Sequence, residues 1–380
     1  MILNYTATCL FGLEGLLGEE IENLGYRRIE NMDGRITFEG DENAAARCSI
    51  NLRFAERLYL HIGSFTATTF TELFDGTKEL PWENIIGRDD EFPVSGHSIK
   101  SKLFSVPDCQ KIIKKAVSVR LGETYSLTRL PETGTRYKIE FFLFKDKANL
   151  MIDLSGAPLH KRGYRPETVE APIRETLAAA MVKLARPREN VLLWDPFCGS
   201  GTIAIEAAMM MKNIAPGLKR SFVSENYPIF PSESWTAARE EAEAKINHNT
   251  EFEAYATDIN DECVRIAEEA AKRAGVSDMI NIFKMDALDI DTLGRRGTIV
   301  TNPPYGDRLL TLEEAESLYR AMGQAFACLD KWQIYVITQS ENFPKLYGRR
   351  ADKIRKLYNG MIPCYYYQFF KNQDSKNKTE

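Results

Sequence analysis

The sequence predicts an α/β protein with two unlike halves: a doubly wound, mainly parallel sheet in the C-terminal half and a smaller α+β region in front of it. Behind residue 170, strand-like and helix-like apolar patterns alternate, as they do in a parallel sheet covered by helices. In front of it the order is irregular and includes a hairpin signal at Asp33-Gly34. A hydrophilic stretch containing several Gly and Pro residues separates the two halves.

The chain of 380 residues is longer than one compact core usually reaches, so more than one domain is expected. Shifts in pattern place the boundaries. The expected segments are a small α/β unit at residues 1–60, a second mixed unit at 61–154, a linker at 155–170 and the doubly wound domain at 171–380.

Each segment carries its own element signals. In the front half we expect a strand at 5–9, helices at 13–24 and 109–121, and a hairpin of strands 137–144 and 147–154. The strands expected in the doubly wound domain are 191–194, 253–257, 280–285, 297–301 and 332–338. The expected helices are 172–185, 202–211, 234–247, 261–274 and 311–329. A last antiparallel hairpin is expected from strands 354–358 and 364–370.

Composition excludes several classes of protein. The chain has no apolar run that could span a bilayer and no basic-then-apolar leader, so we expect a cytosolic protein that does not bind membranes. Its seven cysteines lie far apart, without the paired spacing of a zinc or redox site, so no metal is expected.

The net charge of −5 does not by itself indicate a nucleic-acid-binding protein, but the cations are unevenly distributed. They gather in the front half and in the linker. A solvated helix face is the alternative explanation. The candidate RNA contacts are Lys100, Lys102, Lys111, Lys114, Lys115, Lys161, Arg162 and Arg165.

A glycine-containing turn after the first strand of the doubly wound domain predicts a cofactor site. Its residues are Asp195, Pro196, Phe197, Cys198, Gly199, Ser200, Gly201 and Thr202. Glycines at such a turn let the backbone approach a ligand, and the amides of the following helix can accept a carboxylate. The spacing fits neither a dinucleotide fingerprint nor a Walker loop.

Two acids follow the next strands of this sheet. Asp258 can hydrogen-bond the hydroxyls of a ribose, and Asp286 can accept the amino hydrogens of an adenine. Taken singly, each could also be a helix cap. With their neighbours Ile259 and Ala287, they are expected at the carboxyl edge of the sheet, where open α/β folds bind ligands.

The most specific signal follows the fourth strand, at Asn302-Pro303-Pro304-Tyr305. The two prolines fix the backbone and leave its carbonyls free to accept. The Asn302 side-chain oxygen and the Pro303 carbonyl can then accept both hydrogens of an exocyclic amine and localise its lone pair. Tyr305 offers a flat face on which a base can stack. If the cofactor donates a methyl group, its transfer to this amine needs no strong general base, because the nitrogen gains positive charge as it reacts.

These two motifs resemble the signatures of RNA guanine methyltransferases with an N-terminal THUMP domain. The similar bacterial subgroup methylates the guanine 2-amino group of 23S rRNA and often carries the label of an adenine-specific DNA methylase. The resemblance continues past the second motif to residues 306–308. It extends also to residues 161–165 and 171–178, and in front to residues 75–78, 81–82 and 105–115.

The resemblance implies a class I methyltransferase sheet behind a ferredoxin-like and THUMP region, with S-adenosylmethionine as cofactor. It implies that Thr176 helps to close the cofactor pocket, that Asp258 and Asp286 hold the adenosine, and that Asn302 to Tyr305 hold the target. It also implies that the front half captures RNA.

Alternatives remain open at this point. The Asn-Pro-Pro-Tyr motif also serves amines of adenine, cytosine and a glutamine side chain, so an adenine-specific DNA methyltransferase, a tRNA guanine methyltransferase and a peptide-glutamine methyltransferase are rivals. A non-catalytic RNA-binding protein would be expected to have lost these residues, and they are intact. The Pro-containing stretch at 213–234 has no function that the sequence reveals.

Overall fold

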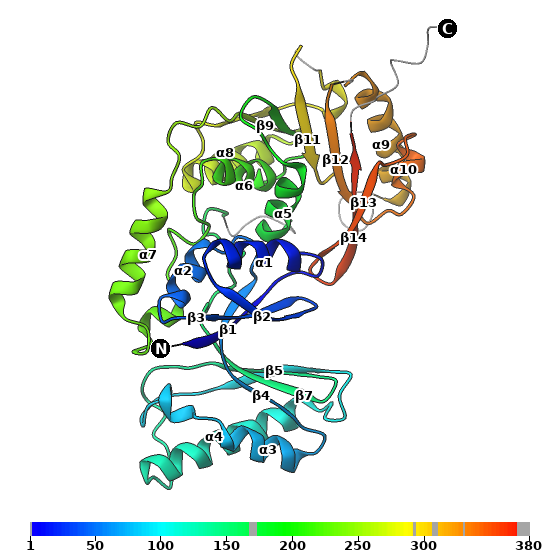
Figure 1. Cartoon of the computed structure of the whole chain (residues 1–380). Coiled ribbons are helices and arrows are strands. Elements are labelled where there is room, and N and C mark those ends of the chain that lie inside the picture. The colour runs from blue at the N-terminus through cyan, green and yellow to red at the C-terminus, as the bar shows by residue number, and fades with distance from the viewer. Residues whose placement is uncertain (1, 167–172, 292–293, 306–310, 330, 371–380) are drawn as a thin grey trace.

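Two seven-stranded sheets organise the computed structural model, which describes residues 2–166, 173–291, 294–305, 311–329 and 331–370 (Figure 1). The N-terminal sheet has the order β2-β3-β1-β4-β7-β6-β5, in which β5 and β6 are parallel and the other neighbours antiparallel. Its strands are β1 (Leu3–Thr8), β2 (Arg27–Met32), β3 (Arg35–Gly40), β4 (Arg57–Thr66), β5 (Val94–Ile99), β6 (Ile139–Phe144) and β7 (Lys147–Asp153).

The long strand β4 joins the two expected front units into one sheet. It pairs with β1 on one side and with β7 on the other. The expected boundary between residues 60 and 61 therefore falls inside a strand. The hairpin expected at Asp33-Gly34 is confirmed, with Gly34 at φ +74° between β2 and β3, and β6 and β7 form the second expected hairpin.

Four helices pack on this sheet, and their bounds are α1 (Glu14–Asn23), α2 (Ala44–Asn51), α3 (Phe70–Glu79) and α4 (Val106–Tyr125). The face of α4 that packs on the sheet contains Ile113, Ala116 and Val117, which are fully buried. In Figure 1, α3 and α4 lie together beneath the part of the sheet that contains β4, β5 and β7.

The C-terminal sheet has the order β10-β9-β8-β11-β12-β14-β13. Its first five strands are parallel, and β14 runs antiparallel to both of its neighbours. This confirms the predicted doubly wound domain and its terminal hairpin. The strands are β8 (Leu192–Asp195), β9 (Ala254–Asp258), β10 (Ile280–Lys284), β11 (Gly297–Thr301), β12 (Gln333–Thr338), β13 (Lys353–Asn359) and β14 (Ile362–Phe369).

Helices cover this sheet on both faces, and the buried side chains form two clusters. These helices are α5 (Glu175–Ala185), α6 (Thr202–Met211), α8 (Asp261–Ala274), α9 (Leu312–Ala325) and α10 (Phe343–Leu346). The helix α7 (Ser232–Ala244) instead packs against α2 of the front half (Figure 1). Buried residues of α9 and α10 belong to one cluster. Those of α5, α6 and α8 belong to a second cluster that continues into the N-terminal sheet, so the two halves share a core.

A buried carboxylate connects the two halves. Glu206 of α6 is fully buried and accepts hydrogen bonds from Arg53 (3.2 Å), Arg162 (3.5 Å) and the Tyr164 hydroxyl (3.1 Å). The expected linker, as far as residue 166, is thus packed between the halves. The expectation that Arg162 contacts RNA is wrong, because its side chain is only 1% exposed and also binds backbone carbonyls of Arg53 and Leu159.

The stretch at 213–234, which the sequence left without a function, is a clamp between the halves. The Tyr227 ring stacks on Tyr137 with centroids 4.3 Å apart, and its hydroxyl donates to the Asp153 carbonyl at 3.1 Å. The Gly217 amide donates to the Ile50 carbonyl at 2.8 Å, and a Cβ at residue 217 would lie 2.6 Å from a backbone oxygen of the front half.

We predict that Glu206→Ala lowers the free energy of unfolding by about 3–5 kcal/mol, because two buried guanidinium groups lose their counter-charge. Guanidinium-induced unfolding followed by circular dichroism measures this change. Glu240→Ala is the matched control, since Glu240 is exposed on α7. Equal unfolding midpoints for the two variants would contradict the role given to Glu206.

Candidate active site

The glycine turn between β8 and α6 has the geometry of a ligand-binding loop. Gly199 (φ +51°) and Gly201 (φ +74°) both adopt left-handed backbone conformations. A Cβ on Gly201 would lie 3.0 Å from the Ala267 side chain, so this glycine lets α6 pack closely against α8. A Cβ on Gly199 would meet no atom within 4 Å. The loop therefore has open space beside Gly199, where a ligand can approach the backbone.

Asp195 links this loop to β11, the strand that precedes Asn302. Its carboxylate accepts hydrogen bonds from the Thr301 hydroxyl at 2.7 Å and from the Phe197 amide at 3.3 Å. Burial raises the pKa of Asp195 to about 7. The side chain is 1% exposed, so in this structure it holds β8 and β11 in register behind the loop.

Asp258 supports the same loop from the end of β9. One carboxylate oxygen accepts the Gly199 amide at 2.9 Å, and the other accepts the Asn260 amide at 3.0 Å. The next side chain, Ile259, is 65% exposed and offers an apolar surface beside the loop. The sequence predicted that Asp258 and Ile259 lie at the same sheet edge as the loop. The hydrogen bonds that orient the Asp258 carboxylate are seen only in the structure.

Asp286 follows β10 and caps a short 3-10 helix, Ala287–Asp289, by accepting the Leu288 amide at 2.9 Å. It is exposed at the carboxyl edge of the sheet, and Ala287 behind it is buried. Capping and ligand binding are compatible, because a carboxylate can accept several hydrogen bonds.

Contacts from the front half fix the start of α5. Thr176 is fully buried and donates to Glu56, which also binds Arg174 (2.6 Å) and His160 (2.9 Å). Burial acts to raise the pKa of Glu56, but the hydrogen bonds and charges of its partners outweigh burial and lower the pKa to about 2. Glu56 was missed by sequence reasoning, because its partners lie more than 100 residues away and leave no local pattern.

Arg165 does not point to an RNA surface. Its guanidinium donates to the Thr202 hydroxyl and to the Ile173 carbonyl, both at 2.8 Å, and its side chain is 16% exposed. It connects the cofactor loop to the residues before α5. Its expected RNA contact is therefore corrected to a positioning role within the cofactor site.

The motif Asn302-Pro303-Pro304-Tyr305, the candidate catalytic motif, begins where β11 ends. Pro303 is buried, while Asn302, Pro304 and Tyr305 are partly exposed. The motif is supported by Tyr319 of α9, whose hydroxyl lies 3.5 Å from the Pro304 carbonyl and 2.9 Å from the Thr338 hydroxyl. Sequence reasoning did not single out Tyr319, which is one of several apolar positions of its helix. Residues 306–308, which also contributed to the resemblance, lie outside the described residues.

These motifs meet because of the sheet topology. The strands β8, β9, β10 and β11 are parallel neighbours, so their carboxyl ends lie at one edge. An open glycine loop, an exposed apolar side chain and an Asn-Pro-Pro-Tyr motif lie together there. This arrangement suits a nucleoside-containing cofactor and a flat substrate that carries an amine.

The candidate RNA contacts of the front half fall into two groups. Lys100, Lys102, Lys111 and Lys115 are exposed, as is Lys161 after the front sheet. Lys114 instead lies over the Phe92 ring and pairs with Glu132 at 2.5 Å, so it contributes to the packing of its own domain.

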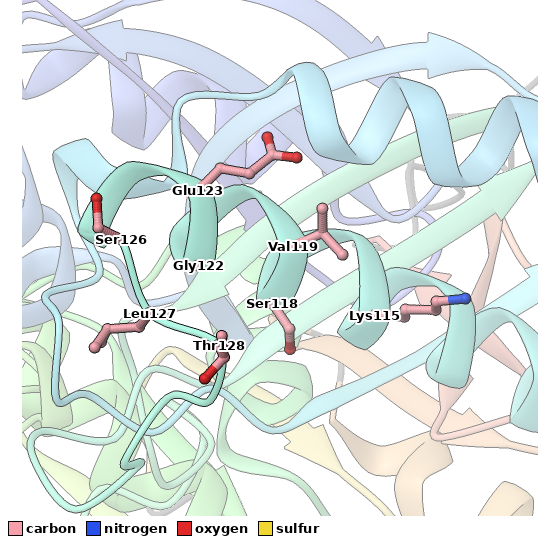
Figure 2. Close-up of a pocket in the computed structure, with 8 residues that line it drawn as sticks. All are labelled: Lys115, Ser118, Val119, Gly122, Glu123, Ser126, Leu127 and Thr128. Carbon is pink, nitrogen blue, oxygen red and sulfur yellow. The ribbon is translucent and has the colours of Figure 1, made fainter.

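A shallow hollow lies on α4 beside Lys115 (Figure 2). None of its residues belongs to the cofactor loop or the catalytic motif, so it is separate from the candidate active site. Its lining residues are Lys115, Ser118, Val119, Gly122, Glu123, Ser126, Leu127 and Thr128.

The sequence reading overlooked a second group of cations. Lys353, Arg355 and Lys356 are exposed on β13, the edge strand of the C-terminal sheet. The run from Arg349 to Lys356 contains five basic residues and one acid, and this local charge was the signal available. It was read only as part of a strand.

Two further findings concern the described residues alone. None of their helices has the length and apolar character needed to cross a membrane. The same residues contain no group of three or more His, Cys, Asp or Glu side chains placed to hold a metal ion.

Family models match three consecutive parts of the chain. Residues 4–59 match an RlmL ferredoxin-like domain, residues 67–153 match a THUMP domain, and residues 162–368 match an RMKL-like methyltransferase domain.

Two similar proteins cover nearly the whole chain. YpsC of Bacillus subtilis, which is named as an RNA methyltransferase without firm assignment, is 45% identical over 98% of both chains. The ribosomal RNA large subunit methyltransferase K/L of Psychromonas ingrahamii is 32% identical over 96% of this chain. The chain spans 49% of the length of that relative.

Solved structures show the same fold. SMU.472, described as a methyltransferase and complexed with SAH, superposes with a TM-score of 0.92 at 38% identity and covers 98% of this chain and 99% of its own. A Listeria monocytogenes protein, described as a predicted N6-adenine-specific DNA methylase, has a TM-score of 0.92 at 44% identity, with 98% and 97% covered. With its ferredoxin-like and THUMP domains in front of the catalytic sheet, the chain belongs to the RMKL-like methyltransferase family.

Proposed function

We propose that this protein transfers a methyl group from S-adenosylmethionine to the exocyclic 2-amino group of a guanine in structured RNA, with 23S rRNA as the substrate. The observation that carries the proposal is the intact Asn302 to Tyr305 motif at the same sheet edge as the glycine loop, behind a THUMP domain. The SAH-bound relative and the K/L relative support the cofactor and the class of substrate.

The residues of the loop fit this cofactor. When bound, it supplies an electrophilic methyl group on a sulfonium. The open face of Gly199 and the amides at the start of α6 suit its carboxylate. Both oxygens of Asp258 already accept a backbone amide, and each keeps a further lone pair for a ribose hydroxyl. Ile259 provides an apolar surface for the adenine, and Asp286 is exposed near by to accept its amino hydrogens.

The target amine is held by acceptors. The Asn302 side-chain oxygen and the Pro303 carbonyl take its two hydrogens, which localises the lone pair on nitrogen and aims it at the methyl group. Tyr305 stacks on the base once the base has left its helix or loop. The nitrogen forms its new bond to carbon as the carbon–sulfur bond breaks, and the extra proton then leaves to water.

The chief alternative is an adenine-specific DNA methyltransferase, because the same acceptor pair can hold an adenine amine and the Listeria relative carries that description. A THUMP domain in front of the site favours RNA, while the exposed lysines there suit the phosphates of either nucleic acid. A tRNA guanine methyltransferase differs from the proposal only in the RNA that is captured.

Nucleoside analysis separates these functions. Methyl groups from labelled S-adenosylmethionine are transferred into total RNA and into DNA from a strain that lacks the gene. We expect the label in 2-amino-methylated guanosine of large-subunit RNA. Label in adenine of DNA would overturn the proposed substrate, and label in tRNA would overturn the choice of 23S rRNA.

We predict that Asn302→Ala slows methyl transfer by about 100-fold or more, because one of the two acceptors of the amine is lost. Cofactor affinity, measured by calorimetry, should stay nearly unchanged, since Asn302 lies at the end of β11 and the loop is held by Asp195 and Asp258. A parallel loss of cofactor binding would show that Asn302 belongs to the cofactor pocket instead.

We predict that the double reversal Lys111→Glu and Lys115→Glu weakens RNA binding and reduces the slope of log affinity against log salt by roughly 2, at about 0.9 per lost phosphate contact. The matched control reverses Lys272 and Lys331, which are exposed at the opposite, amino edge of the C-terminal sheet. Binding to total RNA is measured by filter retention across a salt series. Identical slopes for both double variants would show that α4 lies off the RNA path.

A further inference from the structure

The β13–β14 hairpin extends past the catalytic edge of the sheet. Because β14 runs antiparallel to both neighbours, β13 runs in the same direction as β12, and its end at Asn359 lies on the side where Asn302 follows β11. Thr301 is level with Ile354 through the ladders that join these strands. From Ile354 the hairpin continues to Asn359, about 17 Å further at roughly 3.3 Å per residue.

The tip of this hairpin therefore projects from the same edge of the sheet as the Asn302 motif. Three strand spacings separate β11 from β13 in the sheet, which is about 14 Å at roughly 4.8 Å per spacing. Together the two lengths place the tip roughly 22 Å from Thr301, so an RNA that runs from Asn302 toward the hairpin meets the tip a few nucleotides from the target base.

Apolar side chains occupy the tip, although it faces solvent. Met361 is 84% exposed and Ile362 is 38% exposed. A single exposed apolar residue needs no explanation, but two adjacent ones at the tip of a hairpin beside a catalytic edge are suited to a partner that is itself partly apolar.

The strand that leads to the tip is cationic. Lys353, Arg355 and Lys356 are exposed on β13, and no described residue forms an ion pair with them. Arg174 comes close as well, because a Cβ on Gly360 would lie 3.7 Å from its guanidinium. An apolar tip with exposed cations on the strand that leads to it is complementary to a nucleic acid, which combines stacked bases with a phosphate backbone.

The hairpin is held in place by the front half. Leu357 is buried, and the Phe11 ring meets Tyr358 edge-on with centroids 5.6 Å apart. A Cβ on Gly12 would lie 3.1 Å from the Lys356 carbonyl, so the two backbones are in close contact. Figure 1 shows the hairpin reaching from the C-terminal sheet to α1, and the contacting residues Phe11 and Gly12 precede the start of that helix. The tip therefore has a fixed position relative to the catalytic motif.

Protection of an edge strand explains only part of this pattern. Lysines and arginines on β13 would prevent pairing with another chain. They do not account for Met361 and Ile362, since apolar residues at the tip would promote association rather than prevent it.

We propose that the tip of the β13–β14 hairpin is a wedge that enters the substrate RNA a few nucleotides from the target, with Met361 inserted between two base steps. This inference rests on the proposed function, because a base must leave its stack to reach Asn302. Apolar side chains such as Met, Leu and Ile are the usual wedges between base steps. The cations of β13 hold the adjoining phosphates.

The wedge is tested with one nucleotide in two RNAs. The first substrate is total RNA from a strain that lacks the gene, in which the target is folded. The second is a short single-stranded RNA that contains the mapped target, whose base is already unstacked. Met361→Ala should slow transfer to the folded RNA by about tenfold, because the cost of unstacking is no longer offset. Transfer to the single-stranded RNA should be nearly unchanged, and Met361→Leu should restore most of the rate.

Ile354→Ala is the matched control, because Ile354 is 53% exposed on the same hairpin but level with the end of β11. It should behave as the unmodified protein with both RNAs. Equal rates for Met361→Ala and Ile354→Ala on folded RNA would overturn the wedge, and so would an equal loss on both RNAs. If the unmodified protein labels neither RNA, the proposed function itself fails, which is a different result.

Discussion

The carboxylate of Glu206 fixes how the two halves of the molecule lie. It belongs to α6, the helix that starts at the cofactor loop, and it accepts hydrogen bonds from Arg53 in front and Arg162 in the connecting segment. A buried charge of this kind is tolerated only when its partners stay in place. The surfaces that would capture RNA are therefore oriented by the same helix that carries the cofactor loop, and the Tyr227 clamp reinforces this orientation.

Within the site, the charged side chains form hydrogen bonds with other residues of the protein. Asp195 holds β11, Asp258 holds the Gly199 amide, and Arg165 holds Thr202. Methyl transfer requires two reacting atoms to be aligned closely, and side chains that are already hydrogen-bonded lose little freedom when a ligand arrives. Glu56 extends this network into the front half through Thr176. The start of α5 is thus fixed by a residue of the ferredoxin-like domain.

The sequence predicted the fold and the motifs because both leave local patterns. Alternating apolar runs marked the strands, and the ends of β8, β9, β10 and β11 carried the loop, the two acids and the Asn302 motif. Contacts between distant residues leave no such pattern. The residues that flank Arg162 in the sequence are the same as those expected around an exposed cation. Its burial and its pairing with Glu206 are seen only in the structure. The expected domain boundary after residue 60 divided β4, which unites the two front units, for the same reason.

Recognition of the target depends on the fixed positions of the front half and the hairpin rather than on the two acceptors of the amine. An Asn oxygen and a Pro carbonyl can hold the amine of guanine or adenine equally well, so the role proposed for Asn302 and Pro303 does not select the base. The front half and the hairpin at Met361 are both fixed relative to this pair. An RNA that contacts the front half must therefore present its target at a set distance and direction. The shape of the RNA, read through phosphate contacts, then decides which nucleotide reaches the site.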